Sequence, residues 1–115
     1  MNPIARLIKR RRKTLGLSQK ALADRLGLKY PNFLTAIETG KAEFPLGRWR
    51  DYARALETNE NRVLLAALES VKPDLLEGIA TDDFIGELMR WRGRRSRKGD
   101  ENARAEDDQN FDTPD

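Results

Sequence analysis

The sequence has 115 residues, of which 38% are hydrophobic and 36% are charged, and its net charge is +3. This length predicts one folded domain, and the low hydrophobic share predicts that part of the chain does not fold. Because the chain contains neither Cys nor His, disulfides, thiolate or imidazole metal sites and Ser-His or Cys-His nucleophiles are excluded. We therefore expect no enzyme, no metal and no cofactor.

Two amphipathic helices are predicted near the N-terminus. The first runs from Pro3 to about Leu15, because Pro suits the first helical position, apolar residues recur at helical spacing and Gly16 can end the helix. The second covers residues 19–26 and follows Ser18, whose hydroxyl can cap it.

A tight turn and a third helix follow. Gly27 supplies the positive φ that the turn needs, and Leu28 enters the core between the two helices. The third helix is predicted over residues 31–39, since Pro31 disfavours a helical conformation at Tyr30. Two short helices joined in this way indicate a helix-turn-helix, in which the second helix enters the DNA major groove.

The pattern continues with two or three further helices. Residues 45–56 and residues 61 to about 71 are predicted as the fourth and fifth helices. Pro73 marks a break, and residues 74–80 are ambiguous. A sixth helix, capped by the residue at 81 or 82, is predicted to end at about 92.

The C-terminal composition predicts disorder over residues 93–115, because Phe111 is the one large apolar side chain there. Residues 90–98 carry six Lys or Arg and no acid, whereas residues 99–115 carry seven acids and one Arg. The basic run is either a second nucleic-acid-binding arm or a balance for the acidic tail.

Positive charge also gathers on the helix-turn-helix. Residues 1–41 contain ten Lys or Arg and two acidic residues. Residues 42–89 contain five Lys or Arg and ten acidic residues. A solvated charged face is the simpler explanation, but the overlap with the motif favours a phosphate backbone as partner.

Three motifs carry a family resemblance: LGLSQKALADRLGL at 15–28, AIETGK at 36–41 and LGRWRDYARALETN at 46–59. Together they resemble the Xre group of Cro and phage-repressor type helix-turn-helix proteins, over about residues 3–70. The start of the third helix resembles a Pro-Asn-Phe subgroup. The resemblance implies an all-α, five-helix, lambda-repressor-like domain over 1–72, with a helical extension over 73–92 before the disordered tail.

The resemblance also implies roles for residues of the first two helices. Arg12 is expected to pair with Glu38 and brace the first helix against the third. Arg11 and Lys13 then become the phosphate contacts of the basic run. Gln19 is expected to contact a phosphate or a base edge, with support of the Ser18 cap as the alternative.

The turn and the third helix supply the other candidate DNA contacts. Asn32 can bond adenine in bidentate fashion or simply suit a first helical turn, and Thr35 and Ala36 can touch a thymine methyl. Phe33 is either an exposed group that packs on sugar or thymine, or a core aromatic. The remaining candidates are Lys29, Tyr30, Thr39 and Lys41.

The predicted function is a cytoplasmic, nucleoid-associated regulator, most simply a homodimeric repressor of a palindromic operator in double-stranded DNA. One recognition helix covers only about 4–5 base pairs, so two half-sites are expected, with the dimer formed through the fifth and sixth helices. The alternatives are an antitoxin-type autorepressor whose C-terminal segment binds a protein partner, and an RNA-binding regulator that uses the Arg-rich run. No apolar run approaches the roughly 18 residues of a membrane span.

Overall fold

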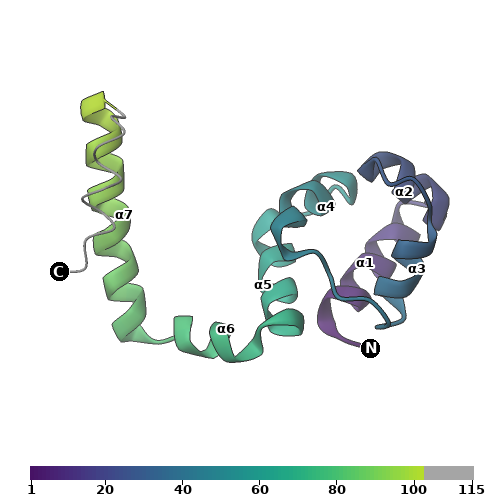
Figure 1. Ribbon diagram of the computed structural model, residues 1–115, viewed down its shortest axis with the longest axis horizontal. Coiled ribbons are helices and arrows are strands. Elements are labelled where there is room, and N and C mark those ends of the chain that lie inside the picture. The colour runs from purple at the N-terminus through teal and green to yellow at the C-terminus, as the bar shows by residue number, and fades with distance from the viewer. Residues whose placement is uncertain (103–115) are drawn as a thin grey trace. The chain divides into compact units, whose positions relative to one another are not determined.

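The computed structural model describes the backbone of residues 1–102 and the side chains of residues 1–96 (Figure 1). It divides into one unit that ends at Leu76 and a second that begins at Glu77. Over the described residues all regular structure is helical, as the sequence predicts. The elements are α1 (Pro3–Thr14), α2 (Gln19–Leu26), α3 (Asn32–Glu38), the 3-10 helix η1 (Leu46–Arg48), α4 (Trp49–Ala55), α5 (Glu60–Val71), α6 (Pro73–Ile79) and α7 (Asp82–Asn102).

Side-chain caps fix where four of these helices begin, and at the start of α7 the Thr81 hydroxyl accepts the Phe84 N–H at 3.1 Å, at one of the two predicted cap positions. The Asn2 side chain accepts the Ala5 N–H at 2.8 Å and so caps α1. Ser18 caps α2 in the same way, as predicted, and Asn59 caps α5. Each cap satisfies an amide that has no partner within its own helix, which stabilises the helix by about 1 kcal/mol.

The core of the first unit lies between α1 to α5, which gather around it in Figure 1. Helix α5 packs against both α1 and α4. The Ile4 N–H donates to Ser70 Oγ at 3.0 Å, so a polar contact also joins α1 to α5. The largest fully buried side chains come from all five helices and from the residue that follows α4: Ile4, Ile8, Leu22, Leu34, Ile37, Tyr52, Leu56 and Val63.

The structure corrects two sequence-based expectations and assigns one segment that the sequence leaves open. The predicted fourth helix begins as the 3-10 turn η1 and becomes α-helical only at Trp49. The ambiguous residues 74–80 are largely covered by α6. Residues 93–102, expected to be disordered, continue α7. The remaining residues of the expected tail, 103–115, lie outside the described residues.

Helix α7 continues past residue 92 because the residues there, although they are not apolar, favour a helical conformation. Arg and Lys have high helix propensity, and the two glycines of this stretch, Gly93 and Gly99, each cost only about 1 kcal/mol. Arg90 pairs with Glu87 one turn earlier at 3.2 Å, and the Arg95 guanidinium lies 5.4 Å from the centre of the Trp91 ring. Low hydrophobicity is therefore a poor guide to the end of this helix.

None of the helices in the described part is both long enough and apolar enough to cross a membrane.

Candidate nucleic-acid interface

Helices α2 and α3 form a compact pair with one buried side. Leu22, Ala23 and Leu26 of α2 are buried, and so are Leu34 and Ile37 of α3. The chain reverses at Gly27, whose φ is 72°, and the Leu28 N–H returns to the Ala23 carbonyl at 2.8 Å. A residue with a side chain would be strained in this left-handed conformation, so glycine favours the turn.

The other side of α3 faces solvent. Asn32, Phe33, Thr35 and Thr39 are exposed and Ala36 is half-buried. The Thr39 hydroxyl donates to the Thr35 carbonyl at 2.9 Å, within its own helical turn. The sequence-predicted contacts of α3 thus share a surface that a DNA base edge can approach.

A buried ion pair supports α3 from behind. Arg12 of α1 donates to both carboxylate oxygens of Glu38, from Nε at 2.8 Å and from Nη2 at 2.9 Å. The two side chains are only 10% and 4% exposed. Arg12 Nη1 also donates to the Leu17 carbonyl at 3.0 Å. The hydrogen bond to Glu38 raises the pKa of Arg12 although burial opposes the shift, so Arg12 stays charged. Its hydrogen bonds hold α1, α3 and the α1–α2 loop together.

Gln19 extends this network to the exposed face of α3. Its Nε2 donates to Glu38 Oε1 at 3.1 Å, and its Oε1 accepts the Thr35 hydroxyl at 2.6 Å. A carboxylate can only accept, so the contact to Glu38 defines which end of the amide is nitrogen. The chain Arg12–Glu38–Gln19–Thr35 therefore orients both Gln19 and Thr35.

This orientation limits what each group offers to a ligand. The Thr35 hydroxyl has used its proton, so it can accept a hydrogen bond from outside while its methyl group remains available for apolar contact. Gln19 keeps one free N–H as a donor.

An aromatic surface lies beside these polar groups. Tyr30 and Phe33 are 64% and 37% exposed. With Leu28, Lys29 and Asn32 they line an open depression of about 450 Å³. Phe33 is therefore exposed and is not a core aromatic, and its packing on a sugar or a thymine methyl stays a prediction.

Arg11 was expected to contact phosphate, but the structure gives it a different role. Its Nη2 donates to the Leu56 and Glu57 carbonyls at 3.1 and 2.9 Å, beyond the C-terminal end of α4. Arg25 of α2 donates to the nearby Ala55 carbonyl at 2.8 Å. These contacts satisfy carbonyls that have no partner within α4.

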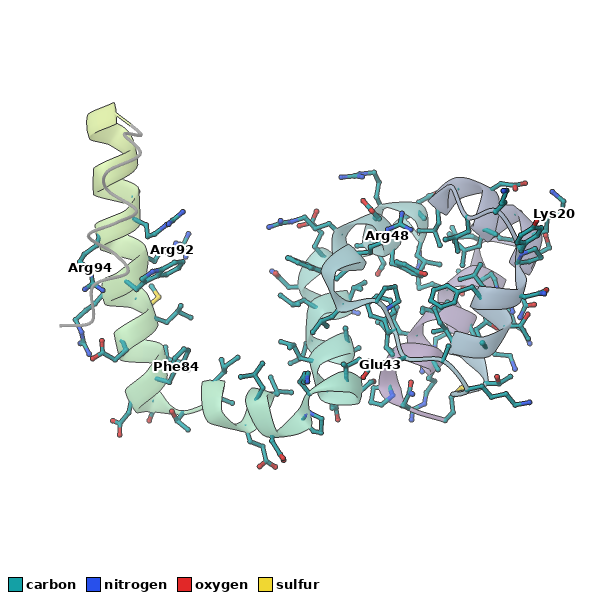
Figure 2. All side chains as sticks on the ribbon, viewed as in Figure 1. Lys20, Glu43, Arg48, Phe84, Arg92 and Arg94 are labelled. Atoms are coloured by element: carbon teal, nitrogen blue, oxygen red, sulfur yellow. The ribbon has the colours of Figure 1, made fainter. Side chains whose placement is uncertain are left out.

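Sequence reasoning missed two of these structural arginines, Arg25 and Arg48. Arg48, labelled in Figure 2, donates to the Leu26 carbonyl at the end of α2 at 2.9 Å. For Arg25 the sequence gives only an indirect indication. The segment after α4 reads Leu-Glu-Thr and lacks the glycine that commonly closes a helix, so a side chain from elsewhere is needed to satisfy the last carbonyls of α4. Part of the positive charge of residues 1–41 is thus committed to holding the fold.

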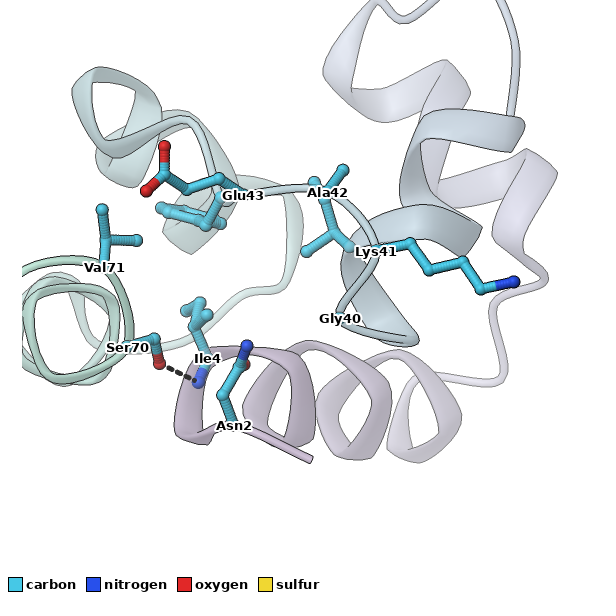
Figure 3. Close-up of a pocket in the computed structure, with 10 residues that line it drawn as sticks. Asn2, Ile4, Gly40, Lys41, Ala42, Glu43, Ser70 and Val71 are labelled. Carbon is cyan, nitrogen blue, oxygen red and sulfur yellow. Dashed lines mark hydrogen bonds between the residues drawn. The ribbon is translucent and has the colours of Figure 1, made fainter.

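Other cations of this region remain available. Lys13, Lys29 and Lys41 are exposed, and among the side chains that the structure describes none of the three forms an ion pair. Lys41 lies at the rim of a pocket of about 230 Å³ between α1, α5 and the loop after α3, and its side chain extends away from it (Figure 3). All three keep their predicted role as possible phosphate contacts.

Comparisons with known proteins agree with this architecture. A family model described as a helix-turn-helix domain matches residues 3–68, which is more than half of the chain. No curated protein and no solved structure gave a match. The matched residues span α1 to α5 almost completely and include the network that runs from Arg12 to Thr35. The chain therefore belongs to the helix-turn-helix domain family.

Proposed function

We propose that the protein is a DNA-binding transcriptional regulator that reads base edges with the exposed face of α3. The observation that carries this proposal is the network Arg12–Glu38–Gln19–Thr35, which connects a buried ion pair to an exposed hydroxyl. A surface threonine does not need such support to remain folded, whereas base readout requires a polar group with a defined orientation.

Asn32, Phe33, Ala36 and Thr39 complete the proposed reading surface, and Lys13, Lys29, Tyr30 and Lys41 contact phosphates beside it. Phosphate contacts position the protein, and base contacts select the sequence.

The regulator acts as a homodimeric repressor on a palindromic operator, in the manner of the Xre group. Helix α3 has seven residues, and one such helix reads too few base pairs to define a unique site. Two copies related by a two-fold axis would read half-sites about one helical turn apart.

The experiment that tests this proposal distinguishes residues that contact bases from residues that contact phosphates. DNA selected from a random pool supplies the operator, and its affinity is compared with that of random duplex DNA. Thr35→Ala and Asn32→Ala should weaken operator binding by roughly 1–3 kcal/mol and random-DNA binding much less. Lys41→Ala should weaken both equally, and Arg62→Ala on α5 serves as the charge control that changes neither.

The salt dependence of binding supplies an independent check. A dimer that neutralises several phosphates should show a log–log slope of magnitude about 6 or more between affinity and salt concentration. Equal losses on both DNAs for Thr35→Ala and Asn32→Ala, or an affinity that does not change with salt, would contradict the proposed function.

A further inference from the structure

Helix α7 carries an apolar stripe whose first two members are exposed and whose third, Trp91, is half-buried. Phe84, Leu88 and Trp91 recur at spacings of four and three residues, which places them along one face of the helix. Phe84 and Leu88 are 40% and 37% exposed, and Ile85 and Met89 beside them are 46% and 55% exposed. Large apolar groups that are grouped in this way mark an interaction surface.

The stripe is shaped to receive a side chain. Phe84, Glu87, Leu88, Trp91 and Arg94 line a hollow of about 370 Å³ on α7. In the heptad pattern of paired helices, Phe84 and Trp91 take the d position, Leu88 the a position, and Glu87 and Arg94 the flanking g position. Four side chains at such positions form the hole into which a side chain of a second helix inserts.

The charges along α7 indicate which helix can pack on the stripe and in which direction. Asp82, Asp83 and Glu87 lie in its first two turns, whereas residues 90–98 carry six Lys or Arg and no acid. Figure 2 shows Arg92 and Arg94 projecting from the helix beyond Phe84. A second copy of α7 running in the same direction would set acid against acid and base against base. A copy running in the opposite direction sets the acidic first two turns of each helix against the basic residues 90–98 of the other.

We propose that α7 pairs in antiparallel fashion with α7 of a second copy of this chain, about a two-fold axis. In the register that the heptad positions define, Leu88 packs against the partner's Trp91 and Glu87 faces the partner's Arg94. Two-fold symmetry repeats both contacts, because such an interface uses the same surface on each subunit. This inference rests on the homodimer of the proposed function and names its interface.

The first test measures the molar mass of the full chain by sedimentation equilibrium without DNA. The wild-type chain should be a dimer. Leu88→Asp should weaken the dimer by about a hundredfold or more, because two buried leucines are lost from each dimer. Leu88→Ala, which keeps helix propensity, should weaken it less but in the same direction, with helicity checked by circular dichroism.

The second test reverses the proposed charge pair. Glu87→Arg and Arg94→Glu should each weaken self-association by about tenfold, since each single variant places like charges opposite each other twice. An equimolar mixture of the two variants should regain the wild-type affinity, because a mixed antiparallel dimer restores both pairs. Arg92→Glu makes the same change in net charge as Arg94→Glu but lies on the other flank, and it should change the affinity by less than about twofold.

Each alternative outcome overturns the pairing. A wild-type chain that stays monomeric would show that something else covers the stripe, such as residues 103–115 of the same chain. A Leu88→Asp variant that stays dimeric would place the interface elsewhere, and a mixture without recovery would exclude the antiparallel register. Because assembly is measured without DNA, the Leu88→Asp chain should still prefer one operator half-site over random DNA if α3 reads bases, so the two proposals fail separately.

Discussion

Helices α1 and α7 have the same kind of sequence pattern and opposite surroundings. Both carry apolar residues at helical spacing among many charged ones. Ile4 and Ile8 of α1 are 1% and 0% exposed, whereas Phe84 and Leu88 of α7 are 40% and 37% exposed. Periodicity therefore predicts which face of a helix is apolar, but it does not predict what covers that face.

The difference has a functional meaning. Burial in the first unit fixes the surface of α3, so substitutions there should change the free energy of unfolding. An apolar face that is exposed on the single chain gains its stabilisation from a second molecule, so substitutions in α7 should change association instead. The predictions below test this contrast, beginning with the largest expected effect.

Loss of the buried ion pair should destabilise the first unit most strongly. Arg12→Ala leaves the Glu38 carboxylate buried and without its bidentate partner, and such a change costs about 3–5 kcal/mol. Urea denaturation at pH 7 measures the loss. The exposed pair Arg50–Glu60 is the control, since its N–O distance is 3.4 Å and both side chains are more than half exposed. Arg50→Ala should cost less than about 1 kcal/mol, and similar losses for both variants would contradict the structural role of Arg12.

Two leucine substitutions compare the units directly. Leu34 is fully buried in α3, and Leu34→Ala should lower the free energy of unfolding by about 2–5 kcal/mol. Leu88→Ala should lower it by less than about 1 kcal/mol when measured at concentrations where the chain is monomeric. A large loss for Leu88→Ala in the monomer would mean that α7 belongs to the folding core.

The pH dependence of the free energy of unfolding should show the effect of burying the Tyr52 hydroxyl. This side chain is fully buried beside Phe44, and its hydroxyl has no hydrogen-bond partner among the described residues. Burial raises its pKa to about 12 from the ordinary 10.0. The folded chain therefore holds the phenol proton more tightly than the unfolded chain, and stability is lost as the pH rises from about 10 towards 12.

Tyr52→Phe should remove this loss. Between pH 9 and pH 11 the wild-type chain should lose about 1.4 kcal/mol more than the variant. At pH 7 the variant should be as stable as the wild type or up to about 1 kcal/mol more stable, because the hydroxyl makes no bond that would be lost. Tyr30→Phe, at an exposed position, should follow the wild-type pH dependence. A strong loss of stability for Tyr52→Phe at pH 7 would reveal a hydrogen bond to an internal water.

The sequence predicted the helical frame of the first unit well, because its signals are local. Gly27 and the Ser18 cap mark the bounds of α2, and α2 was predicted to the residue. The sequence-based prediction ends α7 at about residue 92, which is wrong, because low hydrophobicity excludes burial but does not exclude a helix.

The candidate site was harder to predict because its contacts are distant in sequence. The predicted pair of Arg12 and Glu38 is present, and Thr35 is exposed as expected. The link from Gln19 to Thr35 joins residues 16 positions apart, and the contact of Arg11 with Leu56 spans 45. No spacing rule separates an arginine that binds phosphate from one that caps a neighbouring helix.

The smallest predicted effect concerns how α4 ends. Helices α1, α2 and α3 each end at a glycine of positive φ, Gly16, Gly27 and Gly40, whereas Glu57 takes this position after α4 with a φ of 52°. The backbone there closes in the same way, with the Glu57 N–H on the Arg54 carbonyl at 3.1 Å and the Thr58 N–H on the Ala53 carbonyl at 3.0 Å.

Glu57→Gly relieves a left-handed conformation that costs a non-glycine residue about 1 kcal/mol. It also removes the exposed ion pair with Arg25, which contributes about 0–1 kcal/mol. The net change in the free energy of unfolding should therefore lie between zero and about 1 kcal/mol in favour of the variant. Glu57→Ala loses the same ion pair and keeps the strain, so it should be less stable than Glu57→Gly by about 1 kcal/mol. Equal stability of the two variants in urea would show that the backbone at residue 57 is not strained and that Arg11 and Arg25 alone hold the end of α4.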